Sequence, residues 1–397
     1  GADVNVLMGQ YGAALDSRHS HAANLAAADI GWNSWYELWD GVDEAAVRAN
    51  AALAVGALEP YRPKERRLRV VVDDGWQRGW GDWWPNDKFP AGLDGLATDL
   101  GAKDIDTGVW LAPLLVAADT AVAVDHPEWL VGDATYVHLK NGKMRILDVT
   151  HPGAAAHLAE TISRLVGWQM TLLKIDFLFV CSWQGQRHQD VTPMQACDRA
   201  FEIIRDAAGE DTVLVAVGAP PLPALRYVDA WRNGPDIAVE NFGPAWAFLP
   251  GELRSLAARL PFCMATLCDP DPPILRTLSQ AEVGFGAWTV AAAGGALMLS
   301  DDLRTLPGER LAWGLDDGRA ELALNGKPAR PELLFPAEPP SELANALFDQ
   351  IEGLSRHVVP VVWQLQDGRR VAFNATDAAI VVDDGTTVPA HAALLLQ

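Results

Sequence analysis

Short apolar segments rich in β-branched residues alternate with longer helical patterns along this chain, and this alternation constrains the fold most strongly. The eight strand candidates are Ile30–Ser34, Leu68–Asp73, Thr107–Leu111, Met170–Asp176, Val213–Gly218, Val228–Arg232, Phe262–Leu267 and Ala296–Ser300. The clearest helical patterns between them are Asp43–Ala57, Gly153–Val166, Pro193–Ala207, Gly251–Leu260 and Thr277–Ala293. Strands that alternate with helices indicate a parallel sheet of the α/β class. Eight such units predict a closed (β/α)8 barrel, the TIM barrel.

The pattern changes after Asp302. The segment Gly318–Pro340 is rich in Pro and Gly, Ser341–Leu354 has the pattern of one more helix, and Val358–Leu396 alternates like short strands. The turns in that last segment fall at Asp-Gly pairs, which favour hairpins. We therefore expect a lead-in at residues 1–28, interpreted as the remnant of a β domain, a catalytic barrel at residues 29–317 and a small antiparallel β domain at residues 318–397.

The charge balance limits the partners of the chain. Its 397 residues carry a formal net charge of −21, which argues against nucleic acid and against an anionic membrane surface. A neutral small molecule such as a sugar suits an acidic protein, and no cofactor or metal is implied. The apolar stretch Val283–Leu299 approaches the length of a membrane span, but Gly294-Gly295 splits it into a helix end and a strand. Self-association into a homo-oligomer stays open.

The four cysteines, Cys181, Cys197, Cys263 and Cys268, show no spacing typical of a staple. Cys263 and Cys268 are an odd number of positions apart, so on one strand they would face opposite sides. We therefore expect neither a local disulfide nor a metal pair, which suits a reducing compartment. The first residues lack the basic and apolar segments of a signal peptide, so the expected location is cytoplasmic.

Carboxylates gather where the predicted strands end, which is where barrel enzymes place their catalytic groups. Five strands are followed by such groups, namely Asp73-Asp74, Asp176, Asp236, Asp269-Pro270-Asp271 and Asp301-Asp302. Many of the 16 tryptophans lie beside Gly, Pro and Asp in expected loops, where an indole can stack on a sugar ring. The chain has no Gly-x-Ser-x-Gly elbow and no phosphate loop, which disfavours the other common hydrolase and nucleotide chemistries.

Lys174 and Asp176 lie two positions apart on one expected strand, so both can point into the barrel mouth. A lysine that close favours the ionised aspartate. Asp236 follows a strand two further on, and glycoside hydrolysis needs such a pair, one carboxylate and one protonated acid. From spacing alone, a purely structural Lys174–Asp176 ion pair explains the pattern equally well.

Several strand-end motifs occur together, in this order, in a known family. They are Gly31-Trp32-Asn33-Ser34-Trp35-Tyr36, Asp73-Asp74-Gly75-Trp76-Gln77, Trp110-Leu111-Ala112-Pro113, Lys174-Ile175-Asp176-Phe177, Arg232-Asn233-Gly234-Pro235-Asp236 and Asp269-Pro270-Asp271. With them, the chain from Gly31 to about Leu303 resembles glycoside hydrolase family 36, the melibiase-type α-galactosidases. The Trp110 motif favours this family over family 27, which shares the Asp-Asp-x-Trp-Gln motif.

The resemblance implies a retaining enzyme that removes terminal α-linked galactose from oligosaccharides, with Asp176 as nucleophile and Asp236 as acid/base. The sugar-binding residues it implies are Trp32, Asp73, Asp74, Trp110, Lys174 and Arg232. We expect Arg232 to face the sugar and not Asp236. Cys181 and Trp183, soon after the nucleophile, are candidates for the acceptor side, although a buried Cys and a core Trp explain them equally well.

The chain also departs from the family pattern. Only about thirty residues precede the first strand, Gly218-Ala219-Pro220 replaces a Cys/Gly-rich sugar-binding turn, and Cys268 stands where Asn is usual. The altered turn leaves galactose and N-acetylgalactosamine unseparated. Two other functions stay open: a transglycosylase of the same family, similar to raffinose synthase, and a sugar-binding barrel without activity. Intact Asp176 and Asp236 argue against the second.

Overall fold

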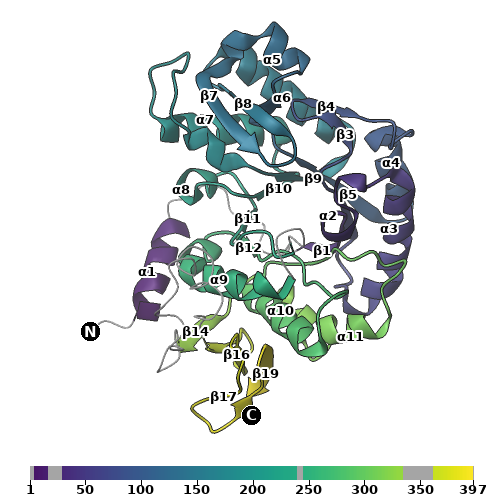
Figure 1. Ribbon diagram of the computed structural model, residues 1–397, viewed down its shortest axis with the longest axis vertical. Helices are drawn as coiled ribbons and strands as arrows, with labels where there is room; N and C mark the ends of the chain where they lie inside the picture. The colour runs from purple at the N-terminus through teal and green to yellow at the C-terminus, as the bar shows by residue number, and fades with distance from the viewer. Residues whose placement is uncertain (1–3, 17–28, 239–244, 334–360, 397) are drawn as a thin grey trace. The chain divides into compact units, whose positions relative to one another are not determined.

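The computed structural model describes residues 4–16, 29–238, 245–333 and 361–396. Its main sheet has eight strands in the order β12, β11, β10, β9, β5, β2, β1 and β13 (Figure 1). They are β1 (Asp29–Asn33), β2 (Leu68–Val72), β5 (Ile105–Leu111), β9 (Met170–Ile175), β10 (Val213–Ala216), β11 (Ala230–Arg232), β12 (Leu267–Asp269) and β13 (Ala296–Leu299). The end strands β12 and β13 contact each other, so the sheet nearly closes on itself. The predicted (β/α)8 barrel is confirmed.

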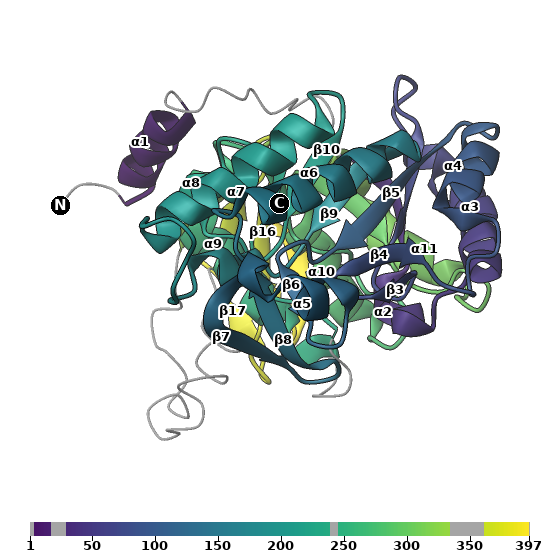
Figure 2. The same ribbon diagram turned by 90° about the horizontal axis from the view of Figure 1, so that it is seen from above.

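The chain divides into two compact units. The first unit holds residues 32–53 and 67–231, and the second unit holds residues 1–31, 54–66 and 232–397. In the first unit, β2, β5, β9 and β10 pair in parallel in that order. Helices α6 (Pro152–Gly167) and α7 (Pro193–Ala208) lie side by side (Figure 2). Both begin with a proline, and Thr192 and Gln195 form a capping box on α7, so local sequence sets where these helices start.

The first unit also carries antiparallel strands that the β/α alternation does not predict. Between β5 and α6 lie β6 (Leu115–Ala117), β7 (Leu130–His138) and β8 (Gly142–Leu147), with β7 and β8 paired as a hairpin (Figure 1). A smaller hairpin, β3 (Gln77–Gly79) and β4 (Asp82–Pro85), follows β2. Both additions leave from the carboxyl ends of barrel strands, the end at which barrel loops carry function.

Eight further α-helices lie within the described residues. They are α1 (Val4–Asp16), α2 (Trp35–Leu38), α3 (Glu44–Leu58), α4 (Gly92–Gly101), α5 (Ala121–Asp125), α8 (Pro221–Ala224), α11 (Glu309–Leu315) and α12 (Arg319–Ala323). The described part of the N-terminal lead-in is therefore the helix α1.

Two long helices of the second unit test the sequence pattern. Helix α9 (Leu249–Cys263) runs through Pro261 and Phe262, and β12 starts only at Leu267, so the expected strand Phe262–Leu267 is wrong over most of its length. A short apolar run has no periodicity that separates a buried helix from a buried strand. Helix α10 (Gln280–Ala293) ends at Gly294, which has φ 68°, a conformation that favours glycine. That ending divides the apolar stretch Val283–Leu299 as predicted.

Within the described ranges, no helix combines the length and the apolar character that a membrane crossing requires.

The C-terminal part forms a small antiparallel sheet, as predicted, with strand order β14, β15, β16 and β19. These strands are β14 (Arg330–Leu333), β15 (Val362–Gln364), β16 (Arg370–Asn374) and β19 (Ala392–Leu396). A further pair, β17 (Ile380–Val381) and β18 (Thr387–Val388), encloses Gly385 with φ 86°. The Asp384-Gly385 pair thus lies in a hairpin turn, as predicted. The helix expected at Ser341–Leu354 falls outside the described residues.

The structure corrects the expectation about cysteines. Cys181 is bonded to Cys197 and Cys263 to Cys268, so none of the four is free. The alternation argument fails for Cys263 and Cys268 because the first ends helix α9 and only the second lies on a strand. The argument from unpaired thiols for a reducing compartment therefore no longer holds.

Candidate active site

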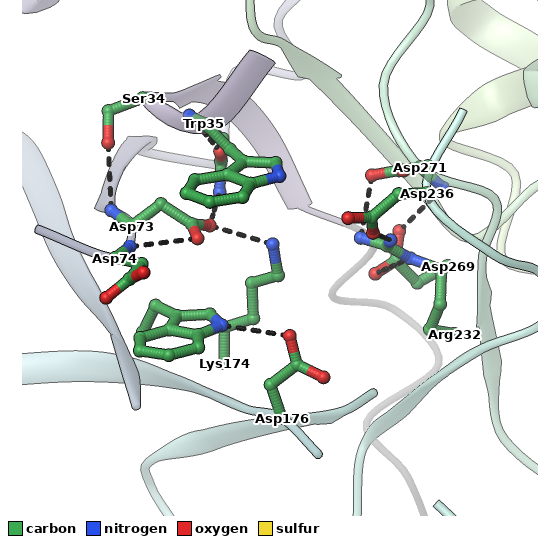
Figure 3. Close-up of polar contacts among 12 residues, drawn as sticks. Ser34, Trp35, Asp73, Asp74, Lys174, Asp176, Arg232, Asp236, Asp269 and Asp271 are labelled. Carbon is green, nitrogen blue, oxygen red and sulfur yellow. Dashed lines mark hydrogen bonds and ion pairs between the residues drawn. The ribbon is translucent and has the colours of Figure 1, made fainter. Parts of the chain in front are cut away.

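Asp176 follows β9 directly and is half-buried. Trp110, on the neighbouring strand β5, donates its indole Nε1–H to Oδ2 of Asp176 at 3.0 Å. The backbone N–H of Phe177 donates to Oδ1 at 2.5 Å. Figure 3 shows this carboxylate near Lys174, whose Nζ points toward Asp73. Two donors aimed at one carboxylate are the surroundings that an anionic nucleophile needs.

Lys174, two positions before Asp176, forms an ion pair with Asp73. Lys174 donates from Nζ to Oδ2 of Asp73 at 2.7 Å, and the side-chain amide of Asn33 donates to the same oxygen at 2.8 Å (Figure 3). The structure thus pairs Lys174 with Asp73, a partner that its spacing from Asp176 does not predict. Strand order explains this, because β5 alone separates β9 from β2 and a lysine side chain spans that width. Spacing along one strand says nothing about partners on other strands.

Asp74 has a different environment from Asp73. Its Oδ1 accepts hydrogen bonds from Gln77 Nε2 at 2.5 Å and from Trp80 Nε1 at 3.1 Å. Burial raises the pKa of Asp74, and those two hydrogen bonds partly oppose the shift. The residue also lines a polar cavity of about 550 Å³ in the first unit, together with Lys88 and Lys140. The two aspartates are adjacent in sequence, but Asp73 forms an ion pair with a lysine, whereas Asp74 faces a cavity.

The tryptophans of the first strand motif have separate roles. Trp32, which the resemblance assigns to the pocket wall, is 0% exposed and belongs to the core. Trp35, after β1, is half-buried, and its ring lies next to Lys174 and Asp73 in Figure 3. A fully enclosed indole cannot stack on a sugar, so Trp35 is the better wall residue. Trp110 is also buried, but its N–H reaches Asp176.

The loop after Asp176 is held in an uncommon conformation and packs among aromatic rings. Phe177 has φ 54° and ψ 29°, the left-handed region that non-glycine residues seldom adopt. Such strain, which clusters at functional sites, aims the Phe177 N–H at Asp176. The rings of Phe179 and Trp183 lie 5.5 Å and 6.1 Å from that of Tyr136. Burial and the negative charge of Asp176 raise the pKa of Tyr136.

The two acceptor-side candidates differ in the structure. Trp183 is half-buried within this aromatic cluster, which we define as Tyr136, Phe179 and Trp183. Cys181 is 4% exposed and is bonded to Cys197 on α7, so it cannot contact an acceptor. Tyr136 was not foreseen, because it lies on the unpredicted strand β7. An alternation of Tyr136 and His138 with exposed Val137 is the signal that could have indicated a half-buried strand there.

In the second unit, one arginine holds three carboxylates. Arg232 ends β11, and its guanidinium lies 3.0 Å from Asp269, 2.7 Å from Asp271 and 3.6 Å from Asp236 (Figure 3). The side chain of Arg232 is 3% exposed and that of Asp236 is 40% exposed. The expectation that Arg232 faces away from Asp236 is therefore wrong. Asp236 follows Arg232 by only four residues, and this short connection keeps the two side chains close. Asp236 is the member of this group that solvent reaches most.

The remaining strand-end carboxylates support the backbone. Asp301 accepts hydrogen bonds from the backbone N–H groups of Leu275 and Arg276. Asp302 binds the guanidinium of Arg304 through both oxygens and accepts a hydrogen bond from the Arg304 backbone N–H. The pattern of carboxylates at five strand ends thus overstates the number of candidate catalytic groups. Across the described residues, no group of three or more His, Cys, Asp and Glu side chains could hold a metal ion.

The barrel nearly closes, one hydrogen-bonded aspartate side chain follows β9, a second aspartate follows β11, and tryptophans lie at the strand ends. This arrangement has the architecture of barrel glycoside hydrolases. The family profile of the melibiases matches residues 65–199. The α-galactosidase AgaA of Geobacillus stearothermophilus is 30% identical over 105 residues, which are 24% of this chain and 14% of that protein. The matched segment therefore makes up a small part of the length of this relative.

Solved structures extend the similarity. An α-galactosidase from Thermus thermophilus in complex with stachyose is 26% identical, with a TM-score of 0.65 over 81% of this chain and 69% of that one. A family 27 β-L-arabinopyranosidase from Geobacillus stearothermophilus, in complex with arabinose, shares the fold at 17% identity. Its TM-score is 0.68, and the alignment covers 95% of this chain and 98% of that one. The family 36 enzyme AgaA shares the fold at 14% identity and a TM-score of 0.61, and the alignment covers 99% of this chain and 57% of that one. The chain is therefore similar to the melibiases over residues 65–199, and its structural neighbours include both a family 27 and a family 36 enzyme, so family 36 specifically stays an expectation.

Proposed function

We propose that this chain is a retaining glycoside hydrolase that removes terminal α-linked galactose from oligosaccharides. The observation that carries the proposal is Asp176, a half-buried carboxylate at a strand end that receives hydrogen bonds from Trp110 and Phe177. These donors hold Asp176 in one orientation, as a nucleophile requires. The similarity of residues 65–199 to melibiases supports the sugar class.

Asp236 is the proposed acid/base. It follows β11, and β10 is the one strand between β11 and β9 in the sheet order. In retaining enzymes the two carboxyl groups lie about 5–5.5 Å apart and act from opposite faces of the glycosidic bond. Arg232 divides its charge among three carboxylates, and Asp236 is the most distant of them. Asp236 is thus the least tightly held and most exposed of the three carboxylates, as contact with a substrate requires.

The proposed sugar contacts follow the structure more than the motifs. The Lys174–Asp73 pair presents a cation and a carboxylate to neighbouring hydroxyls, and Asp74 offers a second acceptor. Trp35 takes the wall role that the resemblance gives to Trp32. Arg232 is bound to carboxylates, so we assign it the positioning of Asp236 and Asp269 in addition to any sugar contact.

The acceptor side is proposed at the aromatic cluster of Tyr136, Phe179 and Trp183. Half-buried rings close to the nucleophile suit stacking on a second sugar ring. The same cluster supports the second candidate function, transglycosylation, in which a sugar replaces water as the acceptor.

The test is an assay with an aryl α-galactoside, with and without an acceptor sugar, followed by proton NMR of the released sugar. We expect release of the α-anomer. Release of the β-anomer first would overturn the retaining mechanism. A transfer product that exceeds free galactose would favour the transglycosylase, and saturable sugar binding without turnover would favour an inactive barrel.

A further inference from the structure

A buried carboxyl lies against the loop that carries Asp236. Glu252, on α9, is 2% exposed. Its Oε1 accepts a hydrogen bond from the side-chain amide of Asn233. Its Oε2 is buried and has no hydrogen-bond partner among the residues that the structure describes. Neither the family motifs nor the proposed mechanism uses this group.

The contact between Glu252 and the loop is close. A β-carbon on Gly234 would overlap Oε2 of Glu252, so any larger residue at this position would force the Glu252 carboxyl to move. Asn233 is held from two further directions, since its N–H donates to the Asp269 carbonyl at 3.0 Å and its own carbonyl accepts from Arg259. Glu252 thus completes a clamp on the two residues that follow Arg232 and precede Pro235 and Asp236.

The charges around Glu252 disfavour another anion. Arg232 is already shared by Asp269, Asp271 and Asp236, and Arg259, on the same helix as Glu252, donates to the carbonyl of Asn233. An ionised Oε2 would be a buried charge without a donor, which is costly, whereas a neutral carboxyl loses much less. Burial raises the pKa of Glu252 well above its ordinary value; Arg232 opposes this shift, and Asp271 and Asp269 add to it.

We propose that Glu252 is a positioning residue, a neutral carboxylic acid that holds Asn233 and Gly234 in place behind Asp236. The inference rests on the proposed function only for the role of Asp236 as acid/base. Ionisation of Glu252 at high pH would place an unpaired charge against Gly234 and displace the loop. Activity that depends on the acid would then fall before the fold is lost.

The first experiment compares Glu252→Gln and Glu252→Ala with the wild type, and uses Glu321→Gln on the exposed side of α12 as the matched control. Glutamine keeps the shape and neutrality of the acid, so kcat/KM should stay within about threefold at neutral pH and persist to higher pH than in the wild type. Alanine should lose up to about 100-fold in kcat, because the loop loses its support. The loss should be larger on a natural disaccharide than on a nitrophenyl galactoside, which scarcely needs the acid.

The second experiment measures Tm against pH and needs no substrate. A folded pKa raised above the unfolded one gives stability that is complete below the unfolded value and is lost as pH rises through the folded value. The wild type should therefore lose Tm relative to Glu252→Gln as pH rises, and Glu321→Gln should show no such trend. A pH-independent difference, or a glutamine variant as inactive as the alanine variant at every pH, would overturn the proposal. A wild type without galactosidase activity would instead overturn the proposed function, and the Tm comparison would still decide the state of Glu252.

Discussion

Nζ of Lys174 lies 2.7 Å from Oδ2 of Asp73, although the two residues are 101 positions apart in the chain. The side chains are 9% and 2% exposed, so the pair is buried. Asp73 also accepts from Asn33, and Ser34 Oγ accepts from the Asp73 N–H at 2.9 Å. The pair thus ties β9 and the end of β2 to the end of β1 in the first unit. It links the barrel core to the residues proposed to bind galactose.

Removing one partner of this pair should destabilise the protein strongly. Lys174→Met leaves Asp73 as a buried charge, and breaking a buried pair in this way costs about 3–5 kcal/mol. The free energy of unfolding, measured by urea titration, should fall by that amount. The double variant Asp73→Asn with Lys174→Met carries no unpaired charge and should recover part of the loss. A single variant that loses less than about 1 kcal/mol would show that water reaches the pair.

The Cys181–Cys197 disulfide has a sequence separation of 16 and begins soon after Asp176, the proposed nucleophile. In the chain-entropy view a loop of that size contributes about 3 kcal/mol, because it restricts the unfolded chain. Cys181→Ser should therefore lower the free energy of unfolding of the oxidised protein by about that amount and should make it less sensitive to dithiothreitol than the wild type. The matched control is Cys263→Ser, whose loop of 5 residues should contribute less. Equal losses in both variants would contradict the loop-length argument.

The sequence predicts the barrel well because β-branched strands and amphipathic helices recur at regular intervals. In each element the spacing of the apolar residues indicates which side chains are buried. It also predicts that Asp176 lies at the mouth of the barrel, because a polar residue that ends a buried apolar strand is placed at the carboxyl end of that strand. The strand at Phe262–Leu267 is the failure of this kind of argument, because an apolar run does not distinguish helix from strand.

Contacts between strands are harder to predict than the strands themselves. The partner of Lys174 is Asp73 because of strand order, which a single sequence does not give. Tyr136 lies on an inserted hairpin, and Glu252 lies on a helix whose register decides that its carboxyl meets Gly234. These three residues depend on tertiary neighbours, and no local motif marks them.

We expect the ionisation of Asp74 to change thermal stability and substrate binding in opposite directions as pH rises. Burial raises its pKa above the ordinary value of 3.8, so the folded protein binds a proton there more readily than the unfolded chain does. As pH rises through the folded pKa, the wild type should lose stability relative to Asp74→Asn in thermal melts. In the same window KM for an α-galactoside should fall, because the ionised carboxylate accepts hydroxyl groups better. Asp119→Asn, an exposed residue on the same cavity, is the control and should change neither trend.

The aromatic cluster predicts a dependence on the second sugar. Trp183→Ala removes one stacking face, worth about 1 kcal/mol, so kcat/KM on a galactosyl disaccharide should fall roughly fivefold more than on an aryl galactoside. Tyr136→Phe keeps the ring and should behave like the wild type, whereas Tyr136→Leu should resemble Trp183→Ala. Steady-state kinetics on both substrates provide the measurement. An equal factor on the two substrates for Trp183→Ala would place this cluster in the core and not at the acceptor side.

The proposed division of labour between Asp176 and Asp236 gives the sharpest test. A nitrophenyl leaving group scarcely needs an acid, so Asp236→Ala should keep useful glycosylation of an aryl α-galactoside and lose far more on a natural disaccharide. Asp176→Ala should fail on both, because no covalent intermediate forms. Azide should then separate the two roles by stereochemistry. With Asp236→Ala it attacks the covalent intermediate and should yield the α-galactosyl azide, whereas with Asp176→Ala it displaces the leaving group directly and should yield the β-azide. NMR of the azide products distinguishes the anomers, and the opposite pair of products would reverse the two assignments.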